Sequence, residues 1–228
     1  MIEFQDASVV APGTSVRILE PTTLSLAERR VAIIGANGSG KSTLARLING
    51  LVFPSTGSVT VDGHDTRRDA AAVRRIVGFL FTDPSAQLIM PTAAEDVALS
   101  LRRTVKAKAD RASAAAAALE SIGLGDKGSV SVHALSGGQR QLLALAGVLA
   151  VAPTIVVADE PTTLLDLRWR AHVDALLAGL PQQVIEVTHD LDAASRADRV
   201  IVMDSGAVAF DGKPRAAVAA YRRLMAGS

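Results

Sequence analysis

Two patterns of apolar and polar residues alternate along the chain. Runs of four apolar residues, such as 31–34 and 155–158, are typical of strands buried on both faces of a parallel sheet. Longer stretches, such as 94–103 and 110–122, have the spacing of amphipathic helices. Strands that alternate with helices predict an α/β fold with a parallel core sheet.

The predicted elements also indicate how the chain is organised. We expect strands at 2–10, 16–19, 22–26, 30–34, 57–62, 76–81, 154–158, 183–187, 199–203 and 207–210. The first three, broken at Pro21, suggest an antiparallel β subdomain at the N-terminus. A helix is expected over 41–48, ended by Asn49-Gly50, and another over 214–225. We therefore predict a single domain over 1–228, in which a core with its β subdomain (about 1–81 and 149–228) carries an inserted helical subdomain (about 82–148).

Composition excludes several classes of function. The chain has 24 basic and 23 acidic residues, a net charge of +1 that gives no support for broad nucleic-acid binding. It has no cysteine, which excludes disulfides, thiolate metal sites and cysteine nucleophiles. No apolar run reaches the roughly 20 residues that a membrane helix needs. If the chain serves a membrane process, we expect it to do so as a peripheral subunit.

A glycine-rich segment after the strand 30–34 matches the phosphate-loop pattern G-x-x-x-x-G-K-[S/T]. Glycines let successive backbone N–H groups point inward around an anion, and the following helix offers its positive end. Lys41 adds charge for the outer phosphates, and the Ser42 hydroxyl can bind Mg²⁺. The residues predicted to bind nucleotide are Gly35, Ala36, Asn37, Gly38, Ser39, Gly40, Lys41, Ser42 and Thr43.

The segment Leu135-Ser136-Gly137-Gly138-Gln139 suggests a second anion site at a helix start. Taken alone, it fits better an ordinary serine N-cap followed by flexible glycines. A functional interpretation therefore depends on the motifs that follow it in the chain.

Acidic residues and a histidine follow two of the later apolar strands. Asp159 ends the strand 154–158, where it can reach Mg²⁺ directly or through water, and Glu160 can accept a proton from an attacking water. His189 follows the strand 183–187 and can hydrogen-bond a terminal phosphate. A lone histidine is more often structural, so its weight comes from its place in this ordered series.

In this order the motifs closely resemble those of the ABC ATPases, over nearly the whole chain. Residues 35–43 resemble the Walker A loop, 135–139 are identical to the LSGGQ signature, and 155–160 resemble the Walker B strand with its catalytic glutamate. The resemblance implies a P-loop NTPase that binds ATP and Mg²⁺, with Glu160 and His189 catalytic. It also implies a homo- or heterodimer in which each signature, Ser136, Gly137, Gly138 and Gln139, caps the ATP of the other subunit. Asp166 stands in the segment that couples the two subunits.

Three positions depart from the family pattern. No aromatic residue stands near the N-terminus to stack on adenine, which leaves Val16 and Arg17 as candidates for that contact. Thr82 replaces the usual glutamine, so its metal contact is expected to run through water. Leu142 stands where relatives often have arginine.

The stretches 79–102 and 146–150 resemble the ATPases of energy-coupling-factor importers, which take up vitamins and transition-metal ions. The Phe81-Thr82-Asp83-Pro84 segment is most similar to the biotin-transport ATPases of that group, with cobalt or nickel uptake as the alternative. This resemblance implies a peripheral position at the cytoplasmic face of the inner membrane. It also implies a transmembrane scaffold that docks near Gln87 and a separate membrane protein that captures the solute. The competing class is a soluble ABC ATPase that acts on DNA or ribosomes.

Overall fold

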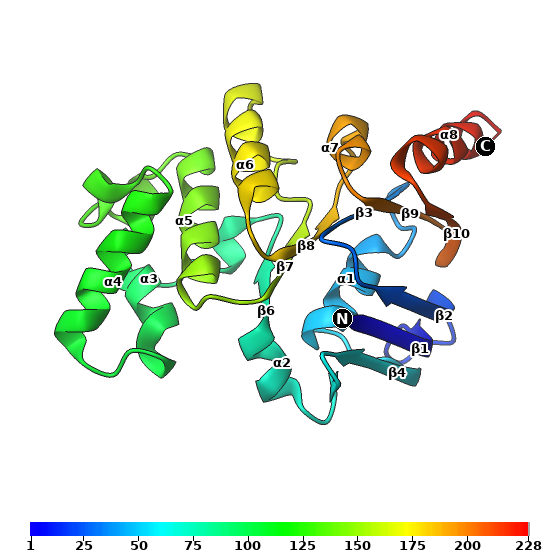
Figure 1. Ribbon diagram of the computed structural model, residues 1–228, viewed down its shortest axis with the longest axis horizontal. Helices are drawn as coiled ribbons and strands as arrows, with labels where there is room; N and C mark the ends of the chain where they lie inside the picture. Colours follow the sequence, from blue (N-terminus) through cyan, green and yellow to red (C-terminus); the bar gives the residue numbers. More distant parts are fainter. Residues whose placement is uncertain (228) are drawn as a thin grey trace. The chain divides into compact units, whose positions relative to one another are not determined.

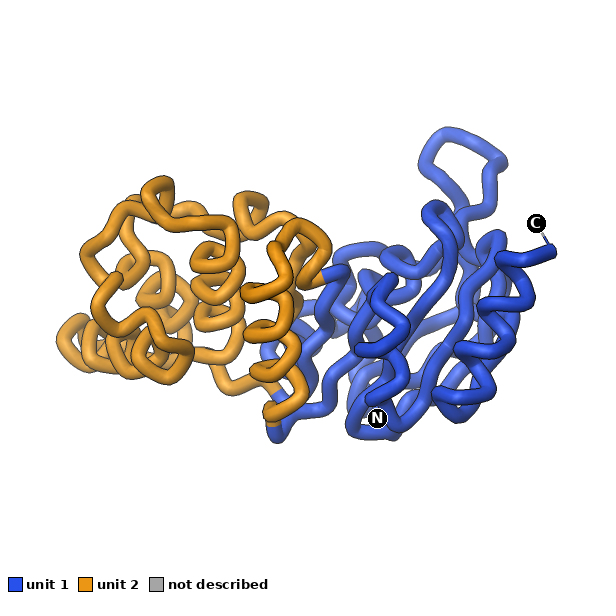
Figure 2. The backbone as a smooth tube through the Cα atoms, turned by 90° about the horizontal axis from the view of Figure 1, so that it is seen from above, with its two compact units in different colours: residues 1–77, 154–160, 181–228 blue, residues 78–153, 161–180 orange. Residues whose placement is uncertain are grey.

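The computed structural model describes residues 1–227, and the chain divides into two units (Figure 2). The first consists of residues 1–77, 154–160 and 181–228, and the second of residues 78–153 and 161–180. The chain therefore passes from one unit to the other more than once, and each unit is assembled from segments distant in the sequence.

The core sheet of the first unit is built around β3 (Arg30–Gly35), which has a parallel neighbour on each side. The strand order is β10-β9-β3-β8-β7, and within it only β10 and β9 pair antiparallel. The other strands are β7 (Ile155–Asp159), β8 (Gln183–Val187), β9 (Arg199–Asp204) and β10 (Ala207–Gly212). This arrangement confirms the predicted α/β fold with a parallel core sheet.

Helices cover both faces of this sheet (Figure 1). α1 (Lys41–Asn49) packs on β7 and β8 on one face, whereas α7 (Leu191–Ser195) and α8 (Pro214–Ala226) cover the other. On the α7 and α8 face, the core consists of Ala32, Ile34, Ala194, Val200, Val202 and Ala217. α1 ends where expected, because Gly50 adopts a left-handed φ of 67° that closes the last turn.

A second sheet in this unit, with strand order β2-β1-β4-β5, is antiparallel as predicted. Its strands are β1 (Ile2–Val10), β2 (Arg17–Leu26), β4 (Thr56–Val61) and β5 (His64–Asp65). The break expected at Pro21 is wrong, because β2 runs through it. The pairing of β2 with β1 shifts register between Ala7↔Thr22 and Val9↔Leu19, and Pro21 lies in this irregularity, where a residue without an N–H is tolerated.

The segment before β6 (Val77–Leu80) also differs from the expected pattern. The sequence pattern predicts a strand from residue 76, but Ile76 ends the unpredicted helix α2 (Ala70–Ile76). Val73 is the only buried residue of this helix. With one buried position in two turns, the helix has no repeating apolar spacing from which it could be predicted.

The second unit is mainly helical. Its helices are α3 (Ala93–Ser100), α4 (Lys108–Ser121), α5 (Gly137–Ala150) and α6 (Leu167–Gly179), with single 3₁₀ turns at Pro84–Ala86, Leu101–Arg103, Gly125–Lys127 and Val132–Ala134. Thr92 and Glu95 form a capping box that starts α3. Leu142, where relatives often have arginine, is buried. Among residues 1–227, no helix has the length and apolar character needed to cross a bilayer.

Packing of α1 on the sheet should govern the stability of the first unit. Leu44 of α1 is fully buried, so we expect Leu44→Ala to lower the free energy of unfolding by about 2–5 kcal/mol through loss of apolar contacts and a residual cavity. Leu51→Ala, at a side chain that is 44% exposed, is the control and should change it by about 0.5 kcal/mol or less. Urea unfolding followed by circular dichroism measures both. Equal losses for the two variants would contradict this account of the core.

Candidate nucleotide-binding site

The carboxyl ends of β3, β7 and β8 meet at one edge of the core sheet, because these strands run parallel. β3 ends at Gly35, β7 at Asp159 and β8 at Val187. The topology therefore gathers the phosphate loop, the acidic pair and the histidine segment at a single edge of the first unit. Ligands of open α/β sheets commonly bind at this edge.

The phosphate loop joins β3 to α1 and lines a cavity of about 280 Å³ together with Ile18 and Glu160. Gly38 and Gly40 have φ values of 78° and 94°, a left-handed conformation that other residues rarely adopt. The Lys41 ammonium donates hydrogen bonds to the carbonyls of Gly35 (2.9 Å) and Ala36 (2.8 Å), which holds the loop closed on itself. It has three N–H donors, so one is left for a phosphate oxygen.

Lys41 and the two acidic residues influence each other electrostatically. Burial lowers the pKa of the Lys41 ammonium, and the carboxylates of Glu160 and Asp159 act in the opposite direction. Lys41 thus carries its charge in a poorly solvated place, where an anion is attracted more strongly than at the surface.

A buried carboxylate links the phosphate-loop helix to β7. Asp159 is 1% exposed, and its Oδ1 accepts a 2.7 Å hydrogen bond from the Ser42 hydroxyl. Its Oδ2 accepts one from the Arg46 guanidinium at 3.1 Å. A hydroxyl and a carboxylate oxygen side by side are the oxygen ligands that Mg²⁺ prefers. Arg46 was missed in the sequence analysis, although its position four residues after Ser42 puts it on the same helix face.

Glu160 and His189 also form a pair. The Nε2 of His189 lies 2.8 Å from the Glu160 Oε1, which joins the ends of β7 and β8. Glu160 has a φ of 50°, a strained value for a residue with a side chain, and its N–H donates to the Val187 carbonyl. Asp190 caps α7 by accepting from the N–H groups of residues 192 and 193, so His189 lies in a turn fixed on both sides.

The LSGGQ segment lies in the second unit, at the start of the 14-residue helix α5. Ser136 and Gln139 form a reciprocal capping box. The Ser136 Oγ accepts from the Gln139 N–H at 3.3 Å, and the Gln139 Oε1 accepts from the Ser136 N–H at 2.9 Å. The serine is therefore an N-cap, and the same geometry leaves the N–H groups of the two glycines at the positive end of a helix.

The remaining predicted residues also lie in the second unit. Asp166 caps α6 by accepting from the Trp169 N–H at 3.0 Å. The Gln87 amide donates to the Ala144 carbonyl at 3.4 Å, and Thr82 follows β6. Ser42 and Asp159 belong to the other unit, so the metal role of Thr82 stays a prediction.

The expected adenine contacts can be compared with the cavity lining. Val16 is 62% exposed, and Arg17 forms a 2.8 Å ion pair with Glu20. The nearby residue that lines the phosphate-loop cavity is Ile18. Ile18 lies in the predicted strand 16–19, but its place at the cavity comes from contact with the distant phosphate loop, which the local pattern does not reveal.

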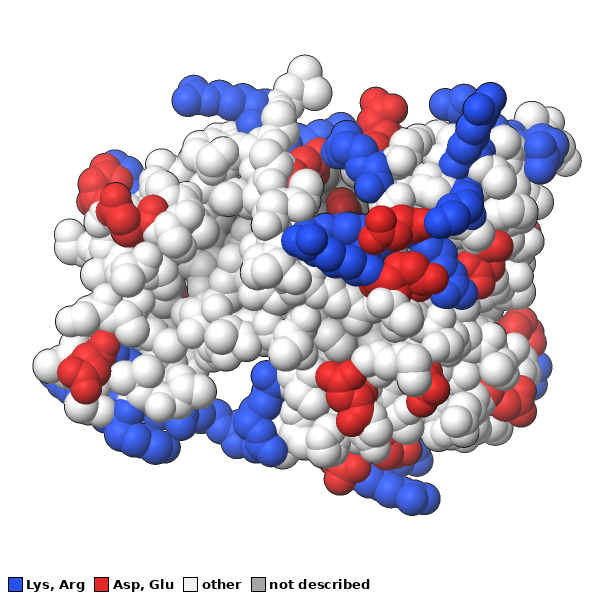
Figure 3. Space-filling model, in the orientation of Figure 1, with Lys and Arg blue, Asp and Glu red and all other residues white. Residues whose placement is uncertain are grey.

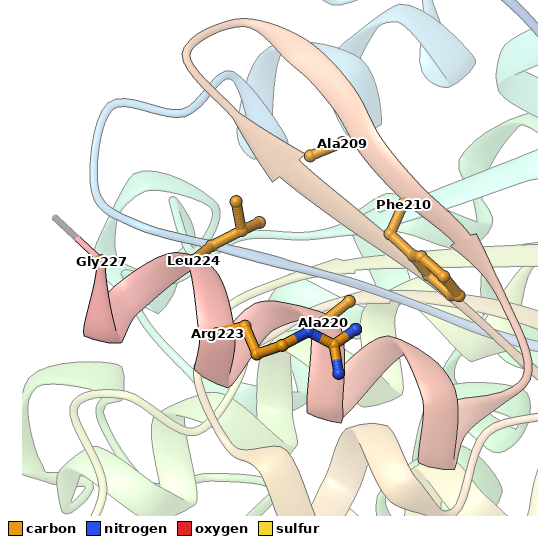
Figure 4. A pocket seen from close by; sticks show the side chains of 6 residues that line it. All are labelled: Ala209, Phe210, Ala220, Arg223, Leu224 and Gly227. Carbon is orange, nitrogen blue, oxygen red and sulfur yellow. The ribbon is translucent and has the colours of Figure 1, made fainter.

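Two other surface features of the first unit lack the combination of cation, hydroxyl and carboxylates found at the phosphate loop. A hollow of about 520 Å³ between β10 and α8 is lined by Phe210, Leu224 and one cation, Arg223, among others (Figure 4). Figure 3 shows acidic and basic side chains next to one another on this unit. In this unit Arg199 forms ion pairs with Glu28 (3.1 Å) and Asp211 (2.6 Å).

The family model described as ABC transporter matches residues 20–163. This range covers more than half of the chain and includes both the phosphate loop and the LSGGQ segment. The chain belongs to the ABC transporter ATP-binding family and is an ATPase.

Three relatives are similar over most of the chain. A protein of Deinococcus radiodurans, named only as an ABC transporter ATP-binding protein, is 47% identical over 91% of this chain and 92% of its own length. The biotin transport ATP-binding protein BioM of Rhizobium etli is 43% identical over 99% of both chains. The energy-coupling factor transporter ATP-binding protein EcfA1 of Symbiobacterium thermophilum is 43% identical over 86% of this chain and 70% of its own.

Two solved structures share the fold. The ATP-binding cassette MJ0796, a dimer bound to ADP and Pi in a post-hydrolysis state, superposes with a TM-score of 0.84 at 30% identity, covering 94% of this chain and 99% of its own. CbiO1 of Clostridium perfringens, part of the ABC transporter complex cbiONQ, has a TM-score of 0.83 at 28% identity, covering 99% of this chain and 93% of its own.

The first test concerns Glu160. We expect Glu160→Gln to slow ATP hydrolysis by about 10²-fold or more, because an amide cannot accept the proton of the attacking water. ATP binding should persist, and a stable dimer should accumulate. Steady-state phosphate release and equilibrium nucleotide binding measure the two effects, and Glu120→Gln at an exposed position of α4 is the matched control. Unchanged turnover would remove Glu160 from the role of general base.

The second test concerns Lys41. Lys41→Ala should weaken nucleotide binding by roughly tenfold or more, because it removes a charge-assisted hydrogen bond to phosphate and the two bonds that close the loop. Titration calorimetry with ATP measures the affinity. Arg215→Ala, at an exposed cation of α8, should leave it unchanged. Equal affinities in both variants would exclude Lys41 from the phosphate site.

Proposed function

We propose that this chain hydrolyses Mg²⁺-ATP within a dimer to drive solute uptake through an energy-coupling-factor type membrane transporter, with biotin as the favoured solute. The observation that carries the proposal is the 43% identity to the Rhizobium etli biotin transport protein over 99% of both chains. Cobalt or nickel import is the alternative solute class. The cbiONQ protein of similar fold is less identical, at 28%.

Within the first unit, Ser42 and Asp159 would hold Mg²⁺. Their oxygens fit that ion, and Mg²⁺ usually takes few protein ligands because it keeps waters and binds phosphate oxygens. Among the residues described, no group of three or more His, Cys, Asp or Glu side chains could hold a metal. When bound, the ion neutralises charge on the outer phosphates.

Glu160 would accept the proton of the attacking water, and His189 would hold the Glu160 carboxylate while contacting the terminal phosphate. The 2.8 Å contact between them supports this pairing, since a base oriented by a second group is the usual arrangement for proton transfer. The φ of 50° at Glu160 is the kind of backbone strain that proteins retain at catalytic positions.

The dimer follows from how the phosphate-binding groups are divided. The phosphate loop belongs to one unit and the helix start at Ser136 to the other, and each provides part of the compensation that a triphosphate needs. In the proposed dimer, Ser136, Gly137, Gly138 and Gln139 of one subunit meet the ATP held by the partner. The dimeric form of MJ0796 supports this arrangement.

The membrane partners would meet the second unit near Gln87. The adjoining loop presents Ile89, which is 71% exposed. Buried Asp96 anchors this loop by accepting from the N–H groups of Ile89 (2.8 Å) and Met90 (2.9 Å). An exposed apolar tip on a fixed loop suits a short helix of a transmembrane scaffold protein. A separate membrane protein would capture the solute, and the ATPase would lie at the cytoplasmic face of the inner membrane.

Co-expression with candidate scaffold and solute-capture membrane proteins from the same genome tests the proposal. A tagged chain should copurify with them, and cells should accumulate labelled biotin in preference to labelled cobalt or nickel. Glu160→Gln should copurify equally but abolish uptake, which separates assembly from ATP-driven transport. If the cells accumulate only cobalt or nickel, biotin is not the solute and the alternative class is correct. ATPase activity that is stimulated by nucleic acid and falls steeply with salt, without membrane partners, would point to the soluble class.

A further inference from the structure

The first turn of α5 lies directly against an indole ring. A Cβ placed on Gly138 would lie 2.2 Å from both Cγ and Cδ2 of Trp169, and 2.6 Å from its Cδ1. These atoms are close to the root of the Trp169 side chain. Making room for them would require a new rotamer of Trp169 or a movement of α6. Gly138 therefore lacks a side chain in a place that the indole already fills.

Trp169 is also tied to the turn that precedes α6. Its backbone N–H donates to the Asp166 carboxylate at 3.0 Å, and its ring contacts the His172 ring edge-on, with centroids 6.1 Å apart. α5 and α6 lie next to each other within the second unit (Figure 1). One residue thus connects the two helices: its backbone bonds to the cap of α6 at Asp166, and its side chain lies against Gly138 of the signature helix.

We propose that Trp169 is a positioning residue that holds the start of α5 in the orientation in which its N–H groups meet the nucleotide of the partner subunit. Its link to Asp166 couples that orientation to the turn before α6. The inference rests on the dimeric ATPase proposed above and adds to it a residue outside the LSGGQ segment.

The physical need for such a residue comes from the two glycines. Glycine has the greatest backbone freedom of any residue type, and the two bonds of the capping box join Ser136 to Gln139 without contacting Gly137 or Gly138. An anion site made of backbone N–H groups is effective when those groups are already oriented. A rigid ring against Gly138 supplies a restraint on the glycine itself, and small misplacements in such sites cost up to about 100-fold in rate.

The first experiment uses Glu160→Gln as the parent, with the ATP-dependent dimer measured by sedimentation. Trp169→Ala should weaken dimerisation by roughly tenfold to 100-fold. Trp169→Phe, which keeps a ring, should stay close to the parent. ADP affinity, which reports on the phosphate loop of the first unit, should be the same in all three proteins. Parent-like dimerisation of the Ala variant, or loss of ADP affinity along with dimerisation, would overturn the positioning role.

A double-mutant cycle separates this role from general packing. Gly138→Ala should suppress dimerisation because its methyl group collides with the indole, and adding Trp169→Ala should restore it to several-fold above Gly138→Ala alone. If the fold-losses in dimer affinity of the two single variants simply multiply in the double variant, the two residues act independently and the proposal is refuted. Failure of this inference can be told apart from failure of the proposed function. In the latter case the Glu160→Gln parent itself would stay monomeric with ATP.

Trp169 also provides its own signal, because it is the only tryptophan in the chain. ATP added to the Glu160→Gln parent should change the tryptophan emission as the partner's nucleotide approaches α5. Emission that stays constant while the dimer forms would contradict contact between this region and the partner's nucleotide site.

Discussion

The buried carboxylate of Asp159 is the group on which the nucleotide site depends. A carboxylate that is 1% exposed is costly unless its oxygens are paired, and here one accepts from Ser42 and the other from Arg46. Both partners lie on α1, the helix that the phosphate loop starts, so the contacts that pay for burying Asp159 also fix α1 against β7. The loop glycines, the Lys41 bonds and the Glu160–His189 pair are arranged around this connection.

Much of this arrangement could be predicted from the sequence, because its signals are local. Three short motifs each predict their own local structure: the apolar run 31–34, the phosphate-loop pattern and the acidic pair after a strand. Parallel strands then bring their carboxyl ends to one edge of the sheet. Arg46 and Ile18 were missed because their roles come from contacts with distant segments. The break expected at Pro21 failed for a related reason: whether a proline interrupts a strand depends on how the strand pairs with its neighbour, here at a register shift, which a local pattern does not record.

The division of phosphate-binding groups between the two units gives the family likeness a physical meaning. The strand-edge site presents a cation, a hydroxyl and acidic groups, whereas the helix start at Ser136 presents backbone dipoles without a charged side chain among its four signature residues. Backbone N–H groups carry only partial charges, so a helix start holds an anion less strongly than a full positive charge does. In the proposed dimer, the signature would complete the binding of a phosphate that Lys41 and Mg²⁺ of the partner subunit hold first.

The course of β2 through Pro21 has a consequence for the behaviour of the chain in concentrated solution. An edge strand with free N–H groups is a template for pairing with another molecule, and such pairing leads to aggregation. Here Pro21 has no N–H, and the N–H of the preceding Glu20 donates to the Gly206 carbonyl at 2.8 Å. The outward donor at Glu20 is therefore already used within the chain, and Pro21 has no N–H to offer on either side, which makes this part of the edge a poor template for a foreign strand.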